Sequence, residues 1–383
     1  MTAARPRLLV VIGTRPDAVK MAPLIAALRA DGGFDVTVCA SGQHRELLDP
    51  VLLDLELAPD IRLPSPAGHS LGALCAQLIE ALDGCIAETR PTRVIVQGDT
   101  STCVAAGLAA FYRRVPLAHV EAGLRSGRMD LPWPEEFNRR VAGLAADLHF
   151  APTTGAAAQL RAEGVPQARI HVTGNTVVDA LLQAIARLDA DPALAMRAAA
   201  DLPRTRATHR LLVVTLHRRE SIGPDLTEMC LALRELVAHN PLEIALPVHG
   251  NPAVRSAIEA ALSDVPGIHL LPPLGYLAFL TLLRRAWLVL TDSGGIQEEA
   301  PSLDLPVVIA RGVTERPELI DAGGAVLAGT GRAAIARHVE ELLRDTARYR
   351  AMCDVANPFG DGTASRRIVA TLRRDAATGA PAA

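Results

Sequence analysis

Residues 8–20 read LLVVIGTRPDAVK, an apolar run followed by a glycine turn and by residues suited to the start of a helix. A short, unbroken apolar run is typical of a strand that is buried on both faces, and Pro16 suits the first turn of a helix. The stretch therefore predicts a strand, a tight turn and a helix, the opening unit of a doubly wound α/β domain.

The same alternation of strand-length apolar runs and helix-length amphipathic segments continues along the chain. Alternation of this kind predicts parallel sheets with helices on both faces. The predicted strands are residues 8–12, 36–40, 94–97, 117–120, 211–215, 243–248, 268–271, 288–291 and 306–310, and the predicted helices include 18–30, 71–89 and 180–200.

The length of 383 residues and a break between the two strand series near residues 175–208 indicate two domains. We predict an α/β protein with two Rossmann-like doubly wound parallel-sheet domains, residues 1–175 and 176–360, facing a cleft at the carboxyl ends of their strands. Residues 361–383 are expected to form a C-terminal helix that packs back toward the N-terminal domain, followed by a frayed tail.

Composition argues against a nucleic-acid-binding protein and against a membrane-spanning one. A net charge of −3 argues against a nucleic-acid partner, and no apolar run approaches the roughly 20 residues that span a bilayer. Six scattered cysteines without a CxxC pair suit reduced thiols, which predicts a cytoplasmic protein with no metal site. A formal dinucleotide fingerprint at 329–334 lacks the second strand that it requires, so no cofactor is expected.

Two helix starts are candidate anion sites. Gly13 opens a turn that carries Arg15 and Lys20, and residues 291–299, TDSGGIQEE, repeat the arrangement in the second half of the chain. Amides at a helix N-terminus attract anions, and glycines let the backbone approach a phosphate. Either stretch alone could be an ordinary strand–helix turn, but the two together favour a nucleotide diphosphate, with Glu299 at a ribose hydroxyl.

Acidic residues and a histidine follow several of the predicted strands. Asp99 and Glu121 each end a predicted strand, Glu135 and Glu136 follow a Pro-Trp-Pro loop, and His217 ends a strand of the second series. Acids at strand ends lie beside the ligand site of such sheets, where neighbouring carboxylates serve general acid–base chemistry. One acid alone would more often be a helix cap or an ion-pair partner, whereas a group of acids indicates catalysis.

Long motifs over about residues 7–370 carry a family resemblance. They are GTRPDAVKMAPL, SGQHRELLD, QGDTSTCVAAGLAAFY, HVEAGLRSGRMDLPWPEEFNRR, TGNTVVDAL, LHRRES, PVHGNP, TDSGGIQEEAPSL and TERPE. In this order they resemble the non-hydrolysing UDP-N-acetylglucosamine 2-epimerase family. The resemblance implies a glycosyltransferase-B type fold and an isomerase that interconverts UDP-N-acetylglucosamine and UDP-N-acetylmannosamine.

The resemblance also implies a mechanism, in which UDP is eliminated to give a glycal and then adds back to it. The product is expected to serve as a precursor in the synthesis of cell-surface polysaccharide. Carried over to matching positions, Asp99, Glu121 and Glu135 are acid–base candidates and His217 assists at the diphosphate. A homodimer is expected. The residues implied to hold UDP are Arg15, Lys20, Phe279, Ser293, Gly294, Gly295, Glu299 and Arg316, and those matching an allosteric substrate site are Gln43, Arg218 and His249, which could equally be ordinary polar residues of the cleft.

Other readings of the same residues stay open. The chain departs from common family sequence at Gly312 and Val313, beside the expected UDP region, which leaves room for a modified sugar such as UDP-2,3-diacetamido-glucuronate. A hydrolysing epimerase, a UDP-sugar glycosyltransferase and an inactive sugar-nucleotide-binding regulator are further alternatives. The GTRP-type loop with its lysine argues against the first, and the acids of the first domain argue against the other two.

Overall fold

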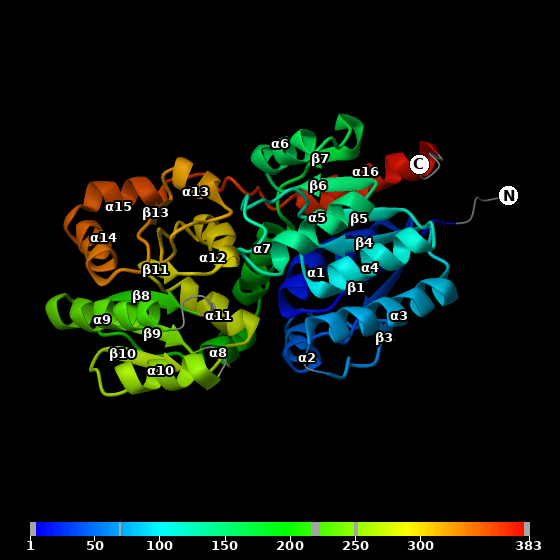
Figure 1. The fold of residues 1–383 in the computed structure, drawn as a ribbon. Helices are drawn as coiled ribbons and strands as arrows, with labels where there is room; N and C mark the ends of the chain where they lie inside the picture. The colour runs from blue at the N-terminus through cyan, green and yellow to red at the C-terminus, as the bar shows by residue number, and fades with distance from the viewer. Residues whose placement is uncertain (1–4, 69, 217–222, 249–251, 379–383) are drawn as a thin grey trace. The chain divides into compact units, whose positions relative to one another are not determined.

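The computed structural model describes residues 5–68, 70–216, 223–248 and 252–378, and it divides the chain into two α/β units. The first unit comprises Met1–Gln183 and Phe359–Ala383, and the second comprises Ala184–Pro358. In Figure 1 the first unit runs from blue to green and ends in red, and the second runs from green to orange. The division falls within helix α7 (Thr176–Ala190), which starts directly after the predicted boundary at residue 175.

The first unit is built on a seven-stranded sheet in the order β3-β2-β1-β4-β5-β6-β7, and every pairing is parallel. Its strands are β1 (Arg7–Ile12), β2 (Asp35–Ala40), β3 (Ile61–Arg62), β4 (Arg93–Gln97), β5 (Leu117–Val120), β6 (Leu148–Ala151) and β7 (Ile170–Val172). Its helices are α1 (Arg15–Asp31), α2 (Arg45–Asp54), α3 (Leu71–Thr89), α4 (Ser101–Tyr112), α5 (Glu135–Ala145), α6 (Thr154–Ala162), the 3-10 turn η1 (Gln167–Arg169) and α16 (Ala364–Thr378).

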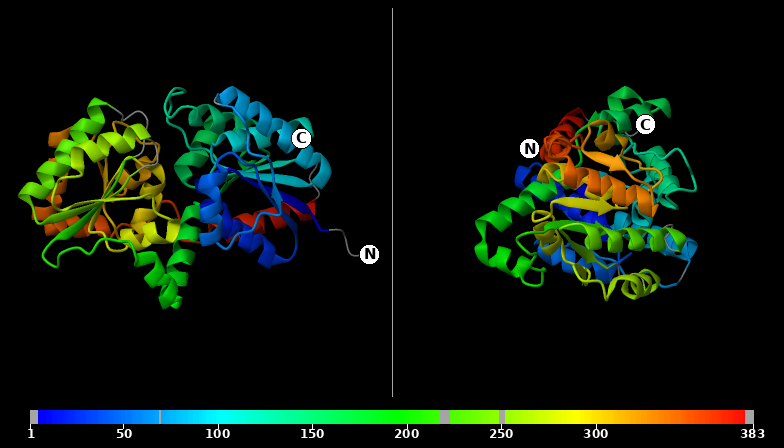
Figure 2. Two further views of the ribbon diagram at one scale, coloured as in Figure 1. Left: turned by 90° about the horizontal axis from the view of Figure 1, so that it is seen from below. Right: turned by 90° about the vertical axis from the view of Figure 1, so that its left-hand side faces the viewer.

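The second unit repeats the plan with six parallel strands in the order β10-β9-β8-β11-β12-β13. The strands are β8 (Arg210–Thr215), β9 (Leu242–Pro247), β10 (Ile268–Leu271), β11 (Leu288–Thr291), β12 (Val307–Ile309) and β13 (Ala325–Leu327). The helices are α8 (Pro192–Ala199), α9 (Pro224–His239), α10 (Pro252–Leu262), α11 (Tyr276–Leu283), α12 (Gly294–Glu299), η3 (Ala300–Leu303), α13 (Pro317–Asp321), α14 (Arg332–Arg344) and α15 (Thr346–Cys353). The left view of Figure 2 shows the twist of this sheet and the helices on either face.

The predicted fold class, a pair of doubly wound parallel-sheet domains, is confirmed. Each central strand is covered by helices on both faces, so its side chains are buried whichever way they point, as with Val94, Ile95 and Val96 of β4. In the first unit α16 packs against α1, and an ion pair joins Arg373 Nε to Asp31 Oδ1 at 2.7 Å. Within the described residues, none of the helices is long and apolar enough to cross a membrane.

The structure differs from the predicted elements in two ways. The helix predicted over 180–200 is two helices, because the Asp191 side chain caps a new helix by accepting from the amides of Ala193 (2.9 Å) and Leu194 (3.0 Å). Three short strands, β3, β6 and β7, were not predicted, and β13 was expected before residue 329 without stated bounds. In β6 the apolar run is interrupted by His149, which is buried, and burial lowers the pKa of its imidazole to about 4, so the ring sits in the core as the neutral form.

Candidate active site

The strand order reverses between β1 and β4 in the first unit and between β8 and β11 in the second. In sheets of this type, ligands bind outside the carboxyl ends of the strands at such a reversal. The pairing of Leu8 with Arg93 and of Val10 with Ile95 runs β1 and β4 in the same direction, so their following loops emerge at the same edge. Those loops contain the GTRPD motif and Asp99.

The loop after β1 is built around Asp17. Thr14 caps α1 and Asp17 completes a capping box, accepting at Oδ2 from the amides of Gly13 (3.0 Å) and Thr14 (3.1 Å). A Cβ at Gly13 would lie 2.5 Å from Ser41 Oγ, so the loop packs too tightly for any larger residue. Arg15 is the first residue of α1 and is half-buried, and Lys20 is buried one turn further on.

Glu121 is the first residue after β5 and is held by three donors. Its Oε2 forms an ion pair with Lys20 Nζ and accepts from Gln97 Nε2 (2.9 Å) and Asn175 Nδ2 (3.1 Å). A carboxylate oxygen can accept hydrogen bonds from several donors at once. The backbone of Glu121 has a φ of +62°, a left-handed conformation that residues other than glycine adopt at some cost and that occurs often at functional sites.

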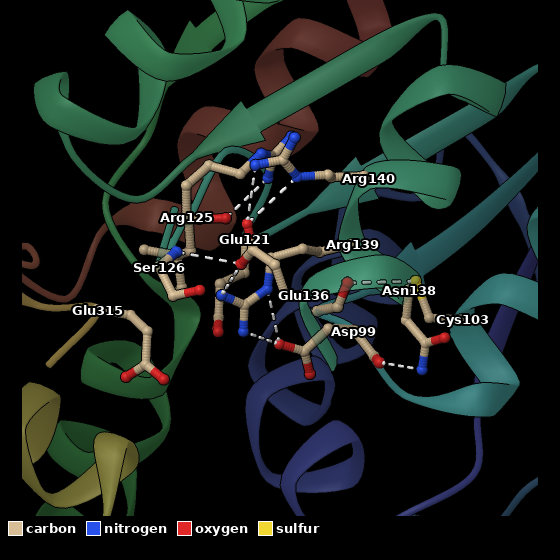
Figure 3. A network of polar contacts seen from close by, with 12 residues as sticks. Asp99, Cys103, Glu121, Arg125, Ser126, Glu136, Asn138, Arg139, Arg140 and Glu315 are labelled. Atoms are coloured by element: carbon tan, nitrogen blue, oxygen red, sulfur yellow. Dashed lines mark hydrogen bonds and ion pairs between the residues drawn. The ribbon is translucent and has the colours of Figure 1, made fainter. Parts of the chain in front are cut away.

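Asp99, in the loop after β4, takes part in a network of ion pairs with side chains of α5 (Figure 3). Its Oδ2 accepts from Arg139 Nε at 3.1 Å and from the terminal nitrogen Nη2 of the same guanidinium. Arg139 Nη1 also reaches Glu136 Oε2 at 3.3 Å, and Arg140 reaches the other oxygen of Glu136. Asn138 Nδ2 donates to the backbone oxygen of Asp99 at 2.8 Å, so α5 holds both the main chain and the carboxylate of this loop.

The buried thiol of Cys103 is affected by three acids of the first unit. Burial raises the pKa of Cys103 well above its usual value, and the negative charges of Asp17, Asp99 and Glu121 raise it further. Three carboxyl groups, one near the start of α1 and two in the loops after β4 and β5, thus all act on one thiol at the start of α4. Neighbouring carboxyl groups of this kind can serve as the acid and the base of a catalysed reaction.

The remaining predicted residues of the first unit have different surroundings. Glu135 begins α5 and is half-buried, whereas the adjacent Glu136 is fully buried and takes part in the network around Arg139. Gln43 accepts from Thr102 N (3.0 Å) and Thr102 Oγ1 (2.7 Å), so its side chain lies at the start of α4. His217, Arg218 and His249, predicted at the diphosphate and at an allosteric site, lie outside the described residues.

In the second unit the predicted UDP residues gather after β11. Helix α12 begins at Gly294, directly after Ser293, whose amide donates to Thr291 Oγ1 at 2.9 Å. A Cβ at Gly294 would lie 2.6 Å from Cζ of Arg316, so the guanidinium packs on the bare backbone. Arg316 Nε donates to the fully buried Glu298 at 2.6 Å, which fixes the arginine beside the helix start.

Other side chains complete this part of the second unit. Thr314 Oγ1 donates to Gln297 Oε1 at 2.8 Å, and Arg311 forms two bonds to Glu315, at 2.9 and 3.1 Å. Glu299 ends α12 and is buried, while Phe279 lies half-buried on α11. Among the described residues, no group of three or more His, Cys, Asp or Glu side chains is arranged to hold a metal ion.

A family model described as UDP-N-acetylglucosamine 2-epimerase matches residues 26–373. The chain belongs to the UDP-N-acetylglucosamine 2-epimerase family. The predicted family and enzyme class, an isomerase, are confirmed.

Relatives of this epimerase family resemble the chain along its whole length. The UDP-N-acetylglucosamine 2-epimerase of Escherichia coli (strain K12) is 44% identical over 372 residues, covering 96% of this chain and 99% of the relative. A crystal structure of the UDP-GlcNAc 2-epimerase from Neisseria meningitidis bound to UDP-GlcNAc has 39% identity and a TM-score of 0.93, covering 96% of this chain and all of that one. The Methanocaldococcus jannaschii UDP-GlcNAc 2-epimerase, in complex with UDP-GlcNAc and UDP, has 30% identity and a TM-score of 0.84, covering 96% of this chain and 99% of that one.

Several residues of this epimerase site were not singled out in the sequence. Asp17 lies inside the quoted GTRPD motif, and its signal was the Thr-x-x-Asp spacing of a capping box. Arg139 follows Glu136 by three residues on one helix, a spacing that predicts an ion pair but not its contact with Asp99. Gln97 and Asn175 carry no such signal, because only the fold brings them to Glu121.

Proposed function

We propose that the protein is a non-hydrolysing 2-epimerase that interconverts UDP-N-acetylglucosamine and UDP-N-acetylmannosamine through a glycal intermediate. The observation that carries the proposal is the pair of strand-end carboxylates, Asp99 and Glu121, each held by a buried cationic side chain near the start of α4. Family membership and the relatives solved with UDP-GlcNAc or UDP support the substrate.

The chemistry requires two acid–base groups and a retained leaving group. C2 of the sugar is not activated by a carbonyl, so a base removes the C2 proton as the C1–O bond breaks, giving a C1=C2 double bond and free UDP. An acid then delivers a proton to the opposite face of C2 while the diphosphate oxygen bonds C1 again. Asp99, Glu121 and Glu135 are the proposed proton carriers, because reversing the configuration calls for one group on each face of the ring.

UDP retention is the second requirement, since loss of UDP would turn epimerisation into hydrolysis. We assign Arg15 and Lys20 in the first unit to the charge of the diphosphate, with assistance from His217. In the second unit, the start of α12 and the buried Arg316 offer amides and a fixed guanidinium to phosphate oxygens. The proposed UDP residues of this unit are Phe279, Ser293, Gly294, Gly295, Glu299 and Arg316.

The wider setting is part of the same proposal. We place the enzyme in the cytoplasm as a homodimer, supplying a UDP-sugar precursor for cell-surface polysaccharide, without a cofactor, metal ion or nucleic acid. Gln43, Arg218 and His249 are the proposed contacts of an activating substrate molecule. A modified UDP-sugar such as UDP-2,3-diacetamido-glucuronate is the alternative substrate, and parallel assays with both donors decide between them by their kcat/KM values.

Incubation with UDP-N-acetylglucosamine in D2O, followed by proton NMR, tests the proposal. Elimination and readdition exchange the C2 proton with solvent, so we expect both epimers to appear with deuterium at C2. The same substrate incubated without enzyme controls for spontaneous exchange. Epimers that form with protium retained at C2, or no epimer at all, would overturn this mechanism or this activity respectively.

A further inference from the structure

We propose that Asp17 is a positioning residue, which joins the loop after β1 to the loop after β4 and so keeps Arg15 and Asp99 in register. The inference rests on the proposed function, because it assigns roles to both of those residues. Asp17 itself takes no part in the proton transfers of the proposed reaction. Its importance comes from where its hydrogen bonds lead.

Asp17 Oδ2 collects hydrogen bonds from both loops. It accepts from the amides of Gly13 (3.0 Å) and Thr14 (3.1 Å) in its own loop, and from Thr100 Oγ1 (3.4 Å) in the other. These three hydrogen bonds to Oδ2 form what we call the Asp17 bridge. Arg15 is the neighbour of Thr14, and Asp99 is the neighbour of Thr100, so the bridge joins the main chain directly beside each proposed functional side chain.

Thr100 carries the bridge into the next helix. Its hydroxyl caps α4, accepting from Cys103 N at 3.2 Å while it donates to Asp17. The hydroxyls of Ser41 and Thr102 lie 2.7 Å apart and close against Gly13, which leaves the loop after β1 little room to move independently. A change at Asp17 is therefore transmitted to both loops rather than absorbed locally.

The other oxygen of Asp17 explains how the bridge tolerates a change of charge. Asp17 is 2% exposed, and its Oδ1 is buried with no hydrogen-bond partner among the described residues. The pKa of Asp17 is raised to about 6, mainly by burial and in small part by the charge of Asp99, while its hydrogen bonds from Thr14 and Gly13 act in the opposite direction. A proton on Oδ1 leaves all three bonds to Oδ2 in place, so the bridge persists in both protonation states.

A simple helix cap is the competing explanation, and the chain contains such caps for comparison. Asp191 caps α8 from an exposed position by bonding the amides of Ala193 and Leu194, both within its own helix start. Asp17 instead reaches a second loop, 83 residues further along the chain. A cap affects only the stability of its helix, whereas the bridge affects ligand binding and turnover as well.

The test compares Asp17→Ala, Asp17→Asn and Asp17→Glu in the full chain, with Asp191→Ala as a matched cap variant. UDP affinity is measured by calorimetry, and kcat and KM for UDP-N-acetylglucosamine are measured by NMR. Because misplacement by about 1 Å costs about 100-fold in rate, we expect Asp17→Ala to lose about 10- to 100-fold in kcat/KM, with weaker UDP binding and lower kcat together. Asparagine keeps an acceptor oxygen and glutamate suits the third position of a capping box, so both should rescue to within about 3-fold of wild type.

Several outcomes would overturn the inference. If Asp17 were only a cap, Asp17→Ala would lower the unfolding midpoint and leave kcat, KM and UDP affinity at wild-type values, which is the result expected of Asp191→Ala. Equal losses in Asp17→Asn and Asp17→Ala would show that the charge, and not the bridge, matters. If Asp17→Ala does not fold, Thr100→Val and Thr100→Ser replace it in the test, because only serine retains the hydroxyl. A loss of kcat/KM and UDP affinity in Thr100→Val, with recovery in Thr100→Ser, supports the bridge. Equal kcat/KM values in the two variants contradict it.

The inference and the proposed function fail in different ways. A wild-type protein that binds UDP but does not epimerise the sugar contradicts the proposed function, and the UDP affinities of the Asp17 series still test the bridge at Arg15. A wild-type protein that epimerises, with an Asp17→Ala variant equal to it, contradicts the bridge alone.

Discussion

The two units share a parallel doubly wound topology, yet the loops at their strand-order reversals are built from different groups. In the first unit the loops after β1, β4 and β5 carry carboxyl groups, and Asp99 and Glu121 are each held by a cation. In the second unit the loop after β11 presents a glycine helix start with Arg316 packed on it. The same backbone plan thus presents carboxyl groups in one unit and a glycine helix start with a guanidinium in the other, so the loops, and not the fold, set the chemical groups that each unit offers.

The two sites also differ in what holds them together. The acids of the first unit depend on buried ion pairs between separate elements, so removing one partner leaves a buried charge. The helix start of the second unit depends on the absence of a side chain at Gly294. The predictions below separate these two kinds of dependence, beginning with the largest effect.

Replacing Arg139 with methionine should be the most damaging of these changes. The substitution leaves Glu136, which is fully buried, and Asp99 without their shared guanidinium. Breaking a buried ion pair costs about 3–5 kcal/mol of unfolding free energy. Misplacement of Asp99 should lower the epimerisation rate about 100-fold. Urea unfolding and NMR rate measurements test both effects.

Arg140→Met is the matched control for this variant. Arg140 pairs with the same Glu136 carboxylate from the same helix, but its side chain is 38% exposed. An exposed partner contributes about 0–1 kcal/mol, so this variant should lose far less stability and turnover than Arg139→Met. Equal effects in the two variants would contradict the role given to Arg139.

The pH dependence of stability should report Asp17. Its folded pKa of about 6 lies above the usual aspartate value of 3.8, so between these pH values the folded state binds a proton that the unfolded chain does not. The stabilising contribution is complete below about pH 4 and is lost as the pH rises through 6, and it amounts to about 3 kcal/mol in full. Asp17→Asn removes this proton uptake, so the stability of wild type relative to Asp17→Asn should fall between pH 4 and pH 7.5. Parallel urea titrations measure it, and a constant difference would show that Asp17 does not titrate in this range.

Gly294→Ala should have a smaller and more local effect. The new methyl group would displace the Arg316 guanidinium, whose Cζ would lie 2.6 Å from it. Losing one charge-assisted hydrogen bond to phosphate weakens UDP binding by about 10-fold, measured by calorimetry. Gly331→Ala is the control, because a Cβ at that residue before α14 meets nothing within 4 Å. Wild-type UDP affinity in Gly294→Ala would remove Arg316 from the proposed site.

Much of the fold could be predicted because the sequences of buried parallel strands are short runs of mainly apolar residues. The run LLVVI at 8–12 lies within β1, and the run at 306–310 contains β12. The runs failed where a strand at the sheet edge has only two or three residues, as with β3 and β7.

The candidate site could be predicted as a set of positions but not as a set of contacts. Lys20 was assigned to the diphosphate, and in the structure it pairs with Glu121, 101 residues away in the sequence. Its role toward UDP stays a prediction. Asn175 was placed at a domain boundary, yet its amide also bonds Glu121. Contacts of this range follow from strand order, which no single motif contains.

The proposal that carboxyl groups of the first unit transfer the proton while the second unit binds UDP is tested most directly by Asp99→Asn. The substitution preserves size and hydrogen bonding to Arg139 through its amide oxygen, but it removes a proton carrier from the first unit without touching α12. We expect UDP affinity within about 3-fold of wild type and an epimerisation rate at least about 100-fold lower, as for loss of a general acid or base. Wild-type turnover in Asp99→Asn would contradict the account.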